Sequence, residues 1–428
     1  MMTIDGWKTT SLPLLLRRMK SGGTPDTSRS DYYGGDIPFV TIEDMTACNR
    51  HLTSTIKTLT DEGLKNSNAW VVPANSILYS IYATLGLPRI NTVPVTTNQA
   101  ILALINDPNK IDRDYLYYWF EHIRAFVVNF SSQTTQSNLN ATIVKTFLVD
   151  HPTDLSEQTK IAVIFSTVNR AIEQTEALIA KQQRIKTGLM QDLLTRGIDE
   201  HGNLRSEQTH RFKDSPLGRI PVEWEVRTLD RLTKAIVDCP HTTPQFTQGG
   251  ILVARTFNIK EGQFLGEQSY ISNEEYKERI LRLEPQKGDV IFTREAPVGE
   301  AFLIPVNFKV CLGQRTMLLR CVLNECLPEY LVEVIYSEDM RIRFDQKVGG
   351  TTNPHLNVGD VRSLAIKQPP IKEQLKITAL LVEIRKTLNC YDQEKSKLCS
   401  IKTALMQDLL TGKKRVNTLM EKILCNHQ

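Results

Sequence analysis

The sequence lacks any long hydrophobic run. Nowhere do 18 apolar residues follow one another, so no segment is predicted to span a membrane. Near the N-terminus a short apolar stretch precedes the basic residues from Arg17 onward, which is the reverse of the order in a secretory signal peptide. We therefore expect no membrane partner.

The sequence has no cysteine spacing that is typical of a metal site or a disulfide framework. The eight cysteines include no CxxC pair, and the two closest in sequence, Cys321 and Cys326, have no histidine nearby. Such spacing is not typical of a zinc site or of a disulfide framework. We expect no metal site, and a reducing, cytoplasmic location fits this cysteine usage.

The common catalytic motifs are also missing. The sequence has no GxxxxGK[ST], no GxGxxG after a strand, no GxSxG, no HExxH and no kinase signature. Asn353-Pro354-His355-Leu356 lacks the second proline and the aromatic ring of an amino-methyltransferase motif, and the acidic spacing from Asp289 to Glu295 is common by chance. No catalytic residue is predicted, and we expect a chain that is not itself an enzyme.

Charge gives little guidance. The formal net charge is +4, which is less basic than many nucleic-acid-binding proteins. This balance neither establishes nor excludes DNA binding, so any phosphate-binding surface has to be a local patch.

A long internal repeat is the strongest feature that is present. Residues 157–195 align without a gap to residues 373–411, and 15 of the 39 positions are identical. The match is tightest at the end, where Leu-Met-Gln-Asp-Leu-Leu-Thr occurs at 189–195 and again at 405–411. A repeat period of about half the chain indicates a duplicated unit rather than a short-repeat solenoid.

Each copy is predicted to form one long helix, because its apolar residues recur at intervals of four and three. At about 1.5 Å per residue the helix would be about 58 Å long. Two such helices can cover each other's apolar stripe as an antiparallel coiled coil; the alternative is an ordinary pair of packed helices in a larger core. The predicted seam consists of Ile161, Phe165, Val168, Ile172, Ile179, Leu189 and Leu193 in the first copy and Ile377, Leu381, Ile384, Leu388, Leu398, Leu405 and Leu409 in the second.

Two globular segments alternate with these helices. Strand-like and helix-like patterns in both predict mixed α/β (α+β) domains, here called the first and second heads. Trp224, Thr243-Pro244 and Gln314 of the second head occupy the positions of Trp7, Thr24-Pro25 and Gln99 of the first, which predicts an internal pseudo-twofold repeat. The predicted order is a first head at 1–150, a helix at 151–196, a linker at 197–220, a second head at 221–370, a helix at 371–415 and a tail at 416–428.

Amide and hydroxyl side chains are enriched on equivalent loops of both heads. Asn and Gln carry the donor–acceptor pair that reads an adenine edge, and hydroxyls hold phosphates. The alternative is a solvated polar loop in which these residues serve the turn. The candidates are Gln133, Thr134, Thr135, Gln136, Asn138 and Asn140 in the first head and Thr351, Thr352, Asn353, His355 and Asn357 in the second.

Basic residues close to these loops are candidate DNA contacts, although each one taken alone is typical of a surface charge. They are Arg17, Arg18 and Lys20 in the first head and Arg294, Arg315 and Lys347 in the second, with Arg341 and Arg343 nearby.

Together these residues resemble the specificity (S) subunits of type I restriction–modification systems, over nearly the whole chain. The most specific motifs are Gly23-Thr24-Pro25 with the 33–40 segment YGGDIPFV, the linker 212–224 FKDSPLGRIPVEW, and the twin LMQDLLT helix ends. The 238–244 segment DCPHTTP also resembles the opening of a recognition domain. One departure is that Pro73-Ala74-Asn75-Ser76 lacks the Lys-Gly-Asp found at 287–289, which weakens residue-by-residue transfer between the heads.

The resemblance implies two target recognition domains held apart by an antiparallel coiled coil, each reading one half of a bipartite sequence in double-stranded DNA. It also implies that the helices bind two methyltransferase (M) subunits, which restriction (R) subunits then join. S-adenosylmethionine, ATP and Mg²⁺ would belong to those partners, and this chain would hold no cofactor.

Other classes of function remain open on the residues alone. One is an enzyme, such as a nuclease or methyltransferase with its site inside one head. Another is the recognition scaffold of a different multisubunit DNA methyltransferase, and a third is a coiled-coil scaffold that binds proteins.

Overall fold

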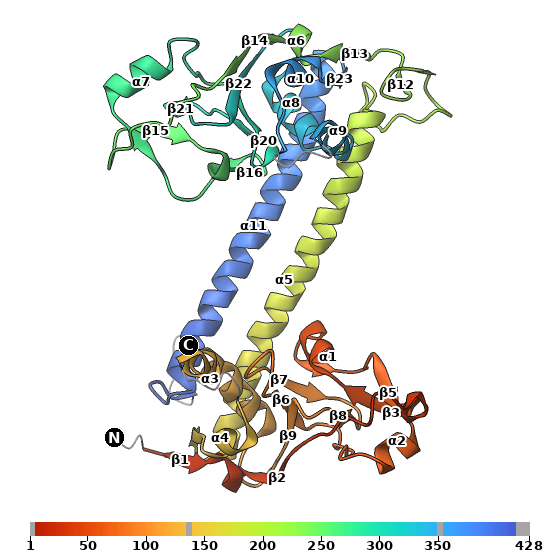
Figure 1. Ribbon diagram of the computed structural model, residues 1–428, viewed down its shortest axis with the longest axis vertical. Helices are drawn as coiled ribbons and strands as arrows, with labels where there is room; N and C mark the ends of the chain where they lie inside the picture. Colours follow the sequence, from red (N-terminus) through yellow and green to blue (C-terminus); the bar gives the residue numbers. More distant parts are fainter. Residues whose placement is uncertain (1–4, 134–138, 349–353, 417–428) are drawn as a thin grey trace, which may run out of the picture. The chain divides into compact units, whose positions relative to one another are not determined.

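The computed structural model describes residues 5–133, 139–348 and 354–416. The chain divides into two compact units, unit 1 being Met1–Glu176 with Gln393–Gln428 and unit 2 being Ala177–Asp392. Each unit contains one head and part of both long helices, which are yellow (α5) and blue (α11) in Figure 1.

The two long helices are α5, Leu155–Thr195, and α11, Ile371–Leu409, so the predicted pair of long helices is confirmed. Neither has a proline in its interior. At the end of α5, Gly197 has a φ of +63° and its N–H donates to the Asp192 carbonyl at 3.2 Å. This left-handed residue satisfies a carbonyl of the last turn and ends the helix.

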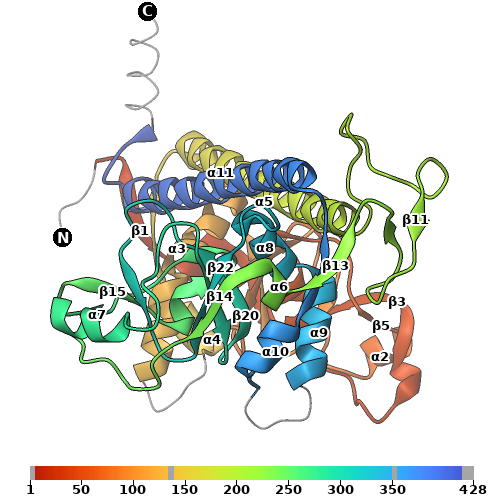
Figure 2. The same cartoon turned by 90° about the horizontal axis from the view of Figure 1, so that it is seen from above.

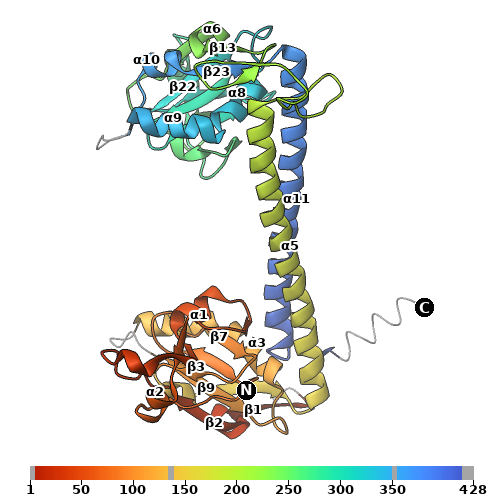
Figure 3. The ribbon, with the colours of Figure 1, turned by 90° about the vertical axis from the view of Figure 1, so that its right-hand side faces the viewer.

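Within each unit the helices run antiparallel and lie side by side (Figures 1 and 3). In unit 1, Ile161 and Phe165 near the start of α5 share a core with Leu409 at the end of α11. In unit 2 the roles reverse, because Ile377 near the start of α11 shares a core with Leu193 near the end of α5. The start of one helix therefore packs with the end of the other in both units.

The predicted seam residues differ in burial along the helices. Six of the buried ones belong to the core that a head forms with the helix ends. Position along the helix does not decide burial alone, because Leu388 in the middle of α11 is buried, whereas Leu189 and Leu405 near the helix ends are partly buried. Seven are buried: Ile161, Phe165, Leu193, Ile377, Leu381, Leu388 and Leu409. The other seven are partly buried: Val168, Ile172, Ile179, Leu189, Ile384, Leu398 and Leu405.

The first head is built on a five-stranded sheet of order β2-β9-β6-β7-β4 and a three-stranded sheet of order β5-β3-β8. Its strands are β1 Trp7–Ser11, β2 Leu16–Ser21, β3 Tyr33–Val40, β4 His51–Leu52, β5 Lys57–Leu59, β6 Ile77–Ser80, β7 Pro88–Asn91, β8 Thr96–Thr97, β9 Ile101–Asn106 and β10 Leu148–Pro152. Its helices are η1 Leu12–Leu15, η2 Ser30–Tyr32, α1 Ile42–Ala47, α2 Asp61–Lys65, α3 Arg113–Gln133 and α4 Ala141–Lys145.

The second head repeats this framework with a four-stranded sheet, β14-β22-β19-β20, and a three-stranded sheet, β18-β15-β21. Its strands are β13 Glu225–Thr228, β14 Thr233–Asp238, β15 Ile251–Ala254, β16 Ile259–Lys260, β17 Gln263–Phe264, β18 Tyr270–Ile271, β19 Val290–Arg294, β20 Val298–Leu303, β21 Val310–Leu312, β22 Thr316–Cys321 and β23 Ala365–Gln368. Its helices are α6 Leu229–Leu232, η3 Thr256–Asn258, α7 Asn273–Arg279, α8 Pro328–Ile335, α9 Glu338–Val348 and α10 Val358–Ser363.

The same pairings occur in both heads. β3 pairs with β8 in parallel, as β15 does with β21, and β1 pairs with β10 antiparallel, as β13 does with β23. The strand β3 stops at Val40, because Thr41 and Asp44 form a capping box that starts α1.

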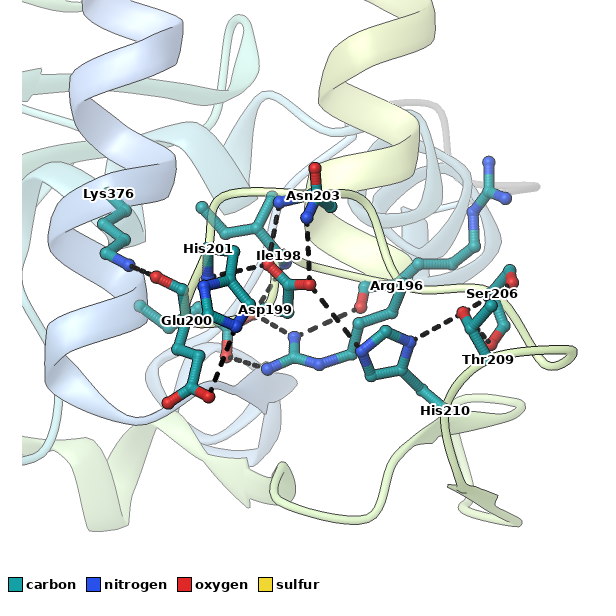
Figure 4. A network of polar contacts seen from close by, with 12 residues as sticks. Arg196, Ile198, Asp199, Glu200, His201, Asn203, Ser206, Thr209, His210 and Lys376 are labelled. Atoms are coloured by element: carbon teal, nitrogen blue, oxygen red, sulfur yellow. Dashed lines mark hydrogen bonds and ion pairs between the residues drawn. The ribbon is translucent and has the colours of Figure 1, made fainter.

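The linker between α5 and the second head carries the short strands β11, Phe212–Lys213, and β12, Ile220–Pro221 (labelled in Figures 2 and 1, respectively). Figure 4 shows its turn, in which the Asp199 carboxylate accepts from the N–H groups of His201 and Asn203 at 2.9 and 2.8 Å. These bonds hold the pKa of Asp199 below its usual value, the bond from Asn203 most of all. Lys376 of α11 donates to the Glu200 carbonyl at 2.7 Å, so the linker is fastened to the first turns of α11.

Two features are absent from the residues that the structure describes: a membrane-spanning helix and a cluster of metal-binding side chains. None of the helices there is both long and apolar enough to cross a membrane. No three His, Cys, Asp or Glu side chains there are grouped so that they could hold a metal ion.

Candidate nucleic-acid interface

Four segments of the second head meet at one edge. The Gln314 amide nitrogen donates to the His241 carbonyl at 3.2 Å and to the Thr243 hydroxyl at 3.3 Å. The Arg294 N–H donates to the Arg315 carbonyl at 3.0 Å, and the Leu356 N–H donates to the Arg294 carbonyl at 2.9 Å. The Thr-Pro loop, the β19–β20 hairpin loop, the turn after β21 and the segment before α10 are thereby held together.

This edge lies at the carboxyl ends of the parallel strands β15 and β21. The Gly313 N–H donates to the Ala254 carbonyl at 2.9 Å. A Cβ at position 313 would lie 2.6 Å from that carbonyl oxygen, so only glycine permits the approach. Ligands of open α/β sheets commonly bind outside the carboxyl ends of parallel strands, and here Gln314 and Arg315 follow directly as exposed residues.

The first head forms the same edge from equivalent residues. The Asn98 N–H donates to the Val40 carbonyl at 3.2 Å, which is the counterpart of the Gly313–Ala254 bond, and the Thr24 hydroxyl donates to the Gln99 side-chain oxygen. The Ile81 N–H donates to the Ala100 carbonyl at 2.9 Å, which is the counterpart of the Arg294–Arg315 bond. Both heads thus use one backbone framework to present their loops.

The side chains on that framework differ between the heads. In the second head Asp238 lies 3.2 Å from Arg294 and 3.4 Å from the imidazole of His241, and Arg315 lies 3.4 Å from Glu295. In the first head the corresponding strand and hairpin positions hold Ser21, Ile81 and Tyr82 instead. The second edge is therefore rich in charge, whereas the first presents hydroxyl, amide and aromatic groups.

Both heads also place cations against aromatic rings. Arg255, the residue after β15, lies 5.2 and 4.5 Å from the rings of Phe246 and Phe257, which are both exposed. In the first head, Arg18 on β2 lies 4.2 Å from the Trp70 ring and Lys20 lies 5.8 Å from it. Such pairs hold a positive charge at the surface without neutralising it.

The predicted basic residues fall into distinct surroundings. Arg294 and Arg315 meet at the edge of the second head described above. Arg17 and Lys347 instead form ion pairs with Asp107 and Asp360, at 3.7 Å in each case.

The predicted polar loops are only partly described. Asn140 and Asn357 are N-caps, whose side chains accept from the N–H groups of Ile143 at 2.9 Å and Asp360 at 2.8 Å. His355 forms a backbone bridge with Glu295, and Gln133 is the last residue of α3, with its side chain outside the described part. Thr134, Thr135, Gln136, Asn138, Thr351, Thr352 and Asn353 lie outside the described residues.

Sequence reasoning does not identify five residues of these edges as candidates: Thr24, Gln99, Thr243, Glu295 and Gln314. For four of them a signal exists, because a Thr-Pro pair and a glutamine occupy equivalent positions in both heads. Glu295 has no such signal, since its counterpart in the first head is Tyr82.

Each unit also has a cavity where its head meets the long helices. In unit 1 the cavity has a volume of about 470 Å³ and is lined in part by Lys402, Thr403 and Met406 of α11. In unit 2 the cavity has a volume of about 640 Å³ and is lined in part by Lys186, Thr187 and Met190 of α5, at the equivalent positions of the repeat. The repeat thus forms two related cavities with different surroundings.

Comparison with known proteins gives a consistent result. The sequence profile described as "Type I restriction modification DNA specificity domain" matches twice, over residues 5–182 and 221–398. The chain is 25% identical over 413 residues to the type I restriction enzyme MjaIX specificity subunit of Methanocaldococcus jannaschii, covering 93% of this chain and 91% of that one. It is 22% identical over 392 residues to the EcoprrI specificity subunit of Escherichia coli, covering 88% of each chain.

Solved structures show the same fold. The type I restriction–modification S subunit from M. genitalium superimposes with a TM-score of 0.59 at 14% identity, covering 94% of this chain and 96% of that one. A chain from a study of complex assembly and conformational transition of the type I R-M system gives a TM-score of 0.56 at 15% identity, covering 95% and 98%. With two matched domains spanning most of its length, the chain belongs to the type I restriction–modification DNA specificity family.

Proposed function

We propose that this chain is the sequence-reading subunit of a type I restriction–modification assembly, and that each head reads one half of a bipartite DNA target. The observation that carries the proposal is the repeated edge: equivalent backbone bonds hold the loops of both heads, yet the side chains presented there differ. A shared framework with different side chains suits two readers of different sequences.

The chemistry of each edge suits double-stranded DNA. Exposed Gln, Arg and Thr side chains are the groups that read base edges and hold phosphates. Arg18, Lys20 and Arg255 add positive charge beside aromatic rings. Because the net charge of the chain is only +4, the support for DNA binding comes from these local basic side chains and not from the overall charge.

We assign docking of two methyltransferase subunits to the long helices. Support comes from apolar side chains exposed along them and from the two equivalent cavities. The exposed apolar residues are Val163, Leu178 and Ile185 of α5 and Leu375, Leu380 and Ile401 of α11. In this proposal methyl transfer and cleavage, with S-adenosylmethionine, ATP and Mg²⁺, belong to the methyltransferase and restriction partners.

The helices also act as the spacer in this proposal. Each of them continues from one unit into the other, so helix length is the property that sets how far apart the two half-sites lie. The target is then two short blocks separated by a gap of fixed length whose bases are not read.

The test is a selection experiment on the complex formed by co-expression with its methyltransferase partner. The complex is used to enrich a library of DNA duplexes of random sequence, and the enriched duplexes are sequenced. We expect two blocks at a fixed separation. Enrichment of one continuous block, or of no sequence, contradicts the proposal; a complex that forms without selecting DNA favours a protein-binding scaffold.

A further inference from the structure

The turn after β21 presents two side chains of opposite hydrogen-bonding character. Gln314 and Arg315 are both exposed, and they follow Gly313, whose close contact with Ala254 fixes the start of the turn. Because β15 and β21 are parallel, the turn stands at the edge where the loops of the second head meet.

The orientation of the Gln314 amide follows from its partners. The His241 carbonyl can only accept a hydrogen bond, so the atom facing it at 3.2 Å has to be the amide nitrogen. The same nitrogen donates to the Thr243 hydroxyl at 3.3 Å. Both N–H groups are then engaged, and within the described residues the side-chain oxygen of this exposed glutamine has no donor, which leaves it available as an acceptor.

Arg315 complements this acceptor with donors. Its side chain is 52% exposed, and its one ion pair in the described part of the chain is a 3.4 Å contact between Nε and Glu295. The terminal nitrogens are left available for a bidentate contact. Arg315 also has a φ of +68°, a strained conformation for a residue with a side chain, and such strain is found preferentially at functional sites.

We infer that the Gln314–Arg315 turn is the base-reading element of the second head, an inference that rests on the proposed DNA-reading function. The Gln314 oxygen accepts from the exocyclic amino group of adenine or cytosine, and Arg315 donates to O6 and N7 of guanine. A glutamine whose amide is free reads adenine with both its amide nitrogen and its amide oxygen. Gln314 offers only the oxygen, so it selects a base that carries an exocyclic amino group. The half-site read by this head contains a guanine beside an adenine or cytosine.

The equivalent turn of the first head, at Gln99 and Ala100, presents different side chains. There Ala100 takes the position of Arg315, so the turn offers an amide without an adjacent guanidinium. The Thr24 hydroxyl donates to the Gln99 oxygen, and the amide N–H groups of Gln99 take no part in that bond. The two turns therefore present different groups to the two half-sites.

The test compares variants in the methyltransferase complex by selection from the random duplex library. Gln314→Leu removes the acceptor, and Arg315→Lys keeps the charge but removes the bidentate fork. Matched controls with the same kind of change are Gln208→Leu and Arg211→Lys, at exposed linker positions. Gel filtration and thermal melting of each complex report whether it is folded.

We expect each turn variant to lose base preference at one position of one block, by about 5- to 150-fold, with the other block and the controls unchanged. An Arg315→Lys complex that keeps the preference at every position but binds all duplexes more weakly overturns the base contact in favour of a phosphate contact. Folded variants that retain both blocks overturn the inference but leave the proposed function intact. If the wild-type complex selects no sequence, the proposed function fails first, so the two failures are distinguishable.

Discussion

The Glu157 carboxylate receives two hydrogen bonds from the Arg415 guanidinium, at 2.8 and 2.6 Å, although the residues lie 258 positions apart. Glu157 is in the first turn of α5, and Arg415 follows the end of α11. The second copy has the same arrangement: Glu373 in the first turn of α11 pairs with Arg205 of the linker that follows α5. Each unit is thus closed by an ion pair between the start of one helix and the segment after the other.

Removal of these carboxylates should affect the two units unequally. The side chains of Arg205 and Glu373 are 9% and 8% exposed, whereas Arg415 is 32% exposed and can be hydrated when it loses Glu157. We expect Glu373→Gln to reduce the free energy of unfolding of unit 2 by about 3 kcal/mol, and Glu157→Gln to reduce that of unit 1 by clearly less. Hydrogen exchange followed separately in each unit measures both losses. Equal reductions in the free energy of unfolding of the two units would show that burial of the arginine does not determine how much stability is lost.

The capping asparagines give a prediction about local stability. Asn140 and Asn357 accept hydrogen bonds at the N-termini of α4 and α10, so replacing either by alanine should cost about 1 kcal/mol of unfolding free energy. Replacing it by aspartate should restore most of that loss, because aspartate is an equally good cap. Urea denaturation of the four single variants measures both effects. An aspartate variant as unstable as the alanine variant would exclude a capping role.

Unit 1 should lose stability in mild acid. His151 is fully buried, and burial lowers its pKa below the usual value near 6.5. Because the unfolded chain then binds a proton at a pH where the folded chain does not, stability falls as the pH drops through about 6.5. Urea denaturation at pH 7.5 and 5.5 measures this loss, which should shrink in His151→Gln. An unchanged pH dependence in that variant would assign the effect to His51 or His122, whose pKa values burial also lowers.

The sequence predicts the long helices well because their determinants are local. Heptad spacing, the absence of proline and the gapless repeat specify α5 and α11 without knowledge of the heads. What the spacing does not contain is which of the seam residues are fully buried. Ile161 and Leu193 are buried because a head's core reaches them, and that contact joins residues far apart in sequence.

The candidate interface was less predictable for the same physical reason. Asn140 and Asn357 stood out as polar loop residues, but the structure engages their side chains as caps. Gln314 did not stand out, because one exposed glutamine has no distinguishing local pattern. Its position depends on a parallel strand pair and on the carbonyl of His241, both of which only the folded chain brings together.

The spacer role can be tested by lengthening both helices at the boundary between the units. Four residues inserted after Glu176 and four after Asp392 extend each helix by about 6 Å. We expect a gap longer by about two base pairs, at about 3.4 Å each, with the same half-sites. The control is the same insertion in the linker after Gly202, which should leave the gap unchanged. If the helix insertions leave the gap and the affinity unchanged, the helices are not the spacer.

The central claim is that each head reads one half of the target independently. The most direct measurement replaces residues 1–150 by the first head of another family member and maps methylated sites by sequencing DNA from cells that express the chimera with its methyltransferase partner. The account predicts that one block of the target changes, while the other block and the gap stay the same. A chimera that assembles and methylates but changes both blocks, or neither, would contradict it.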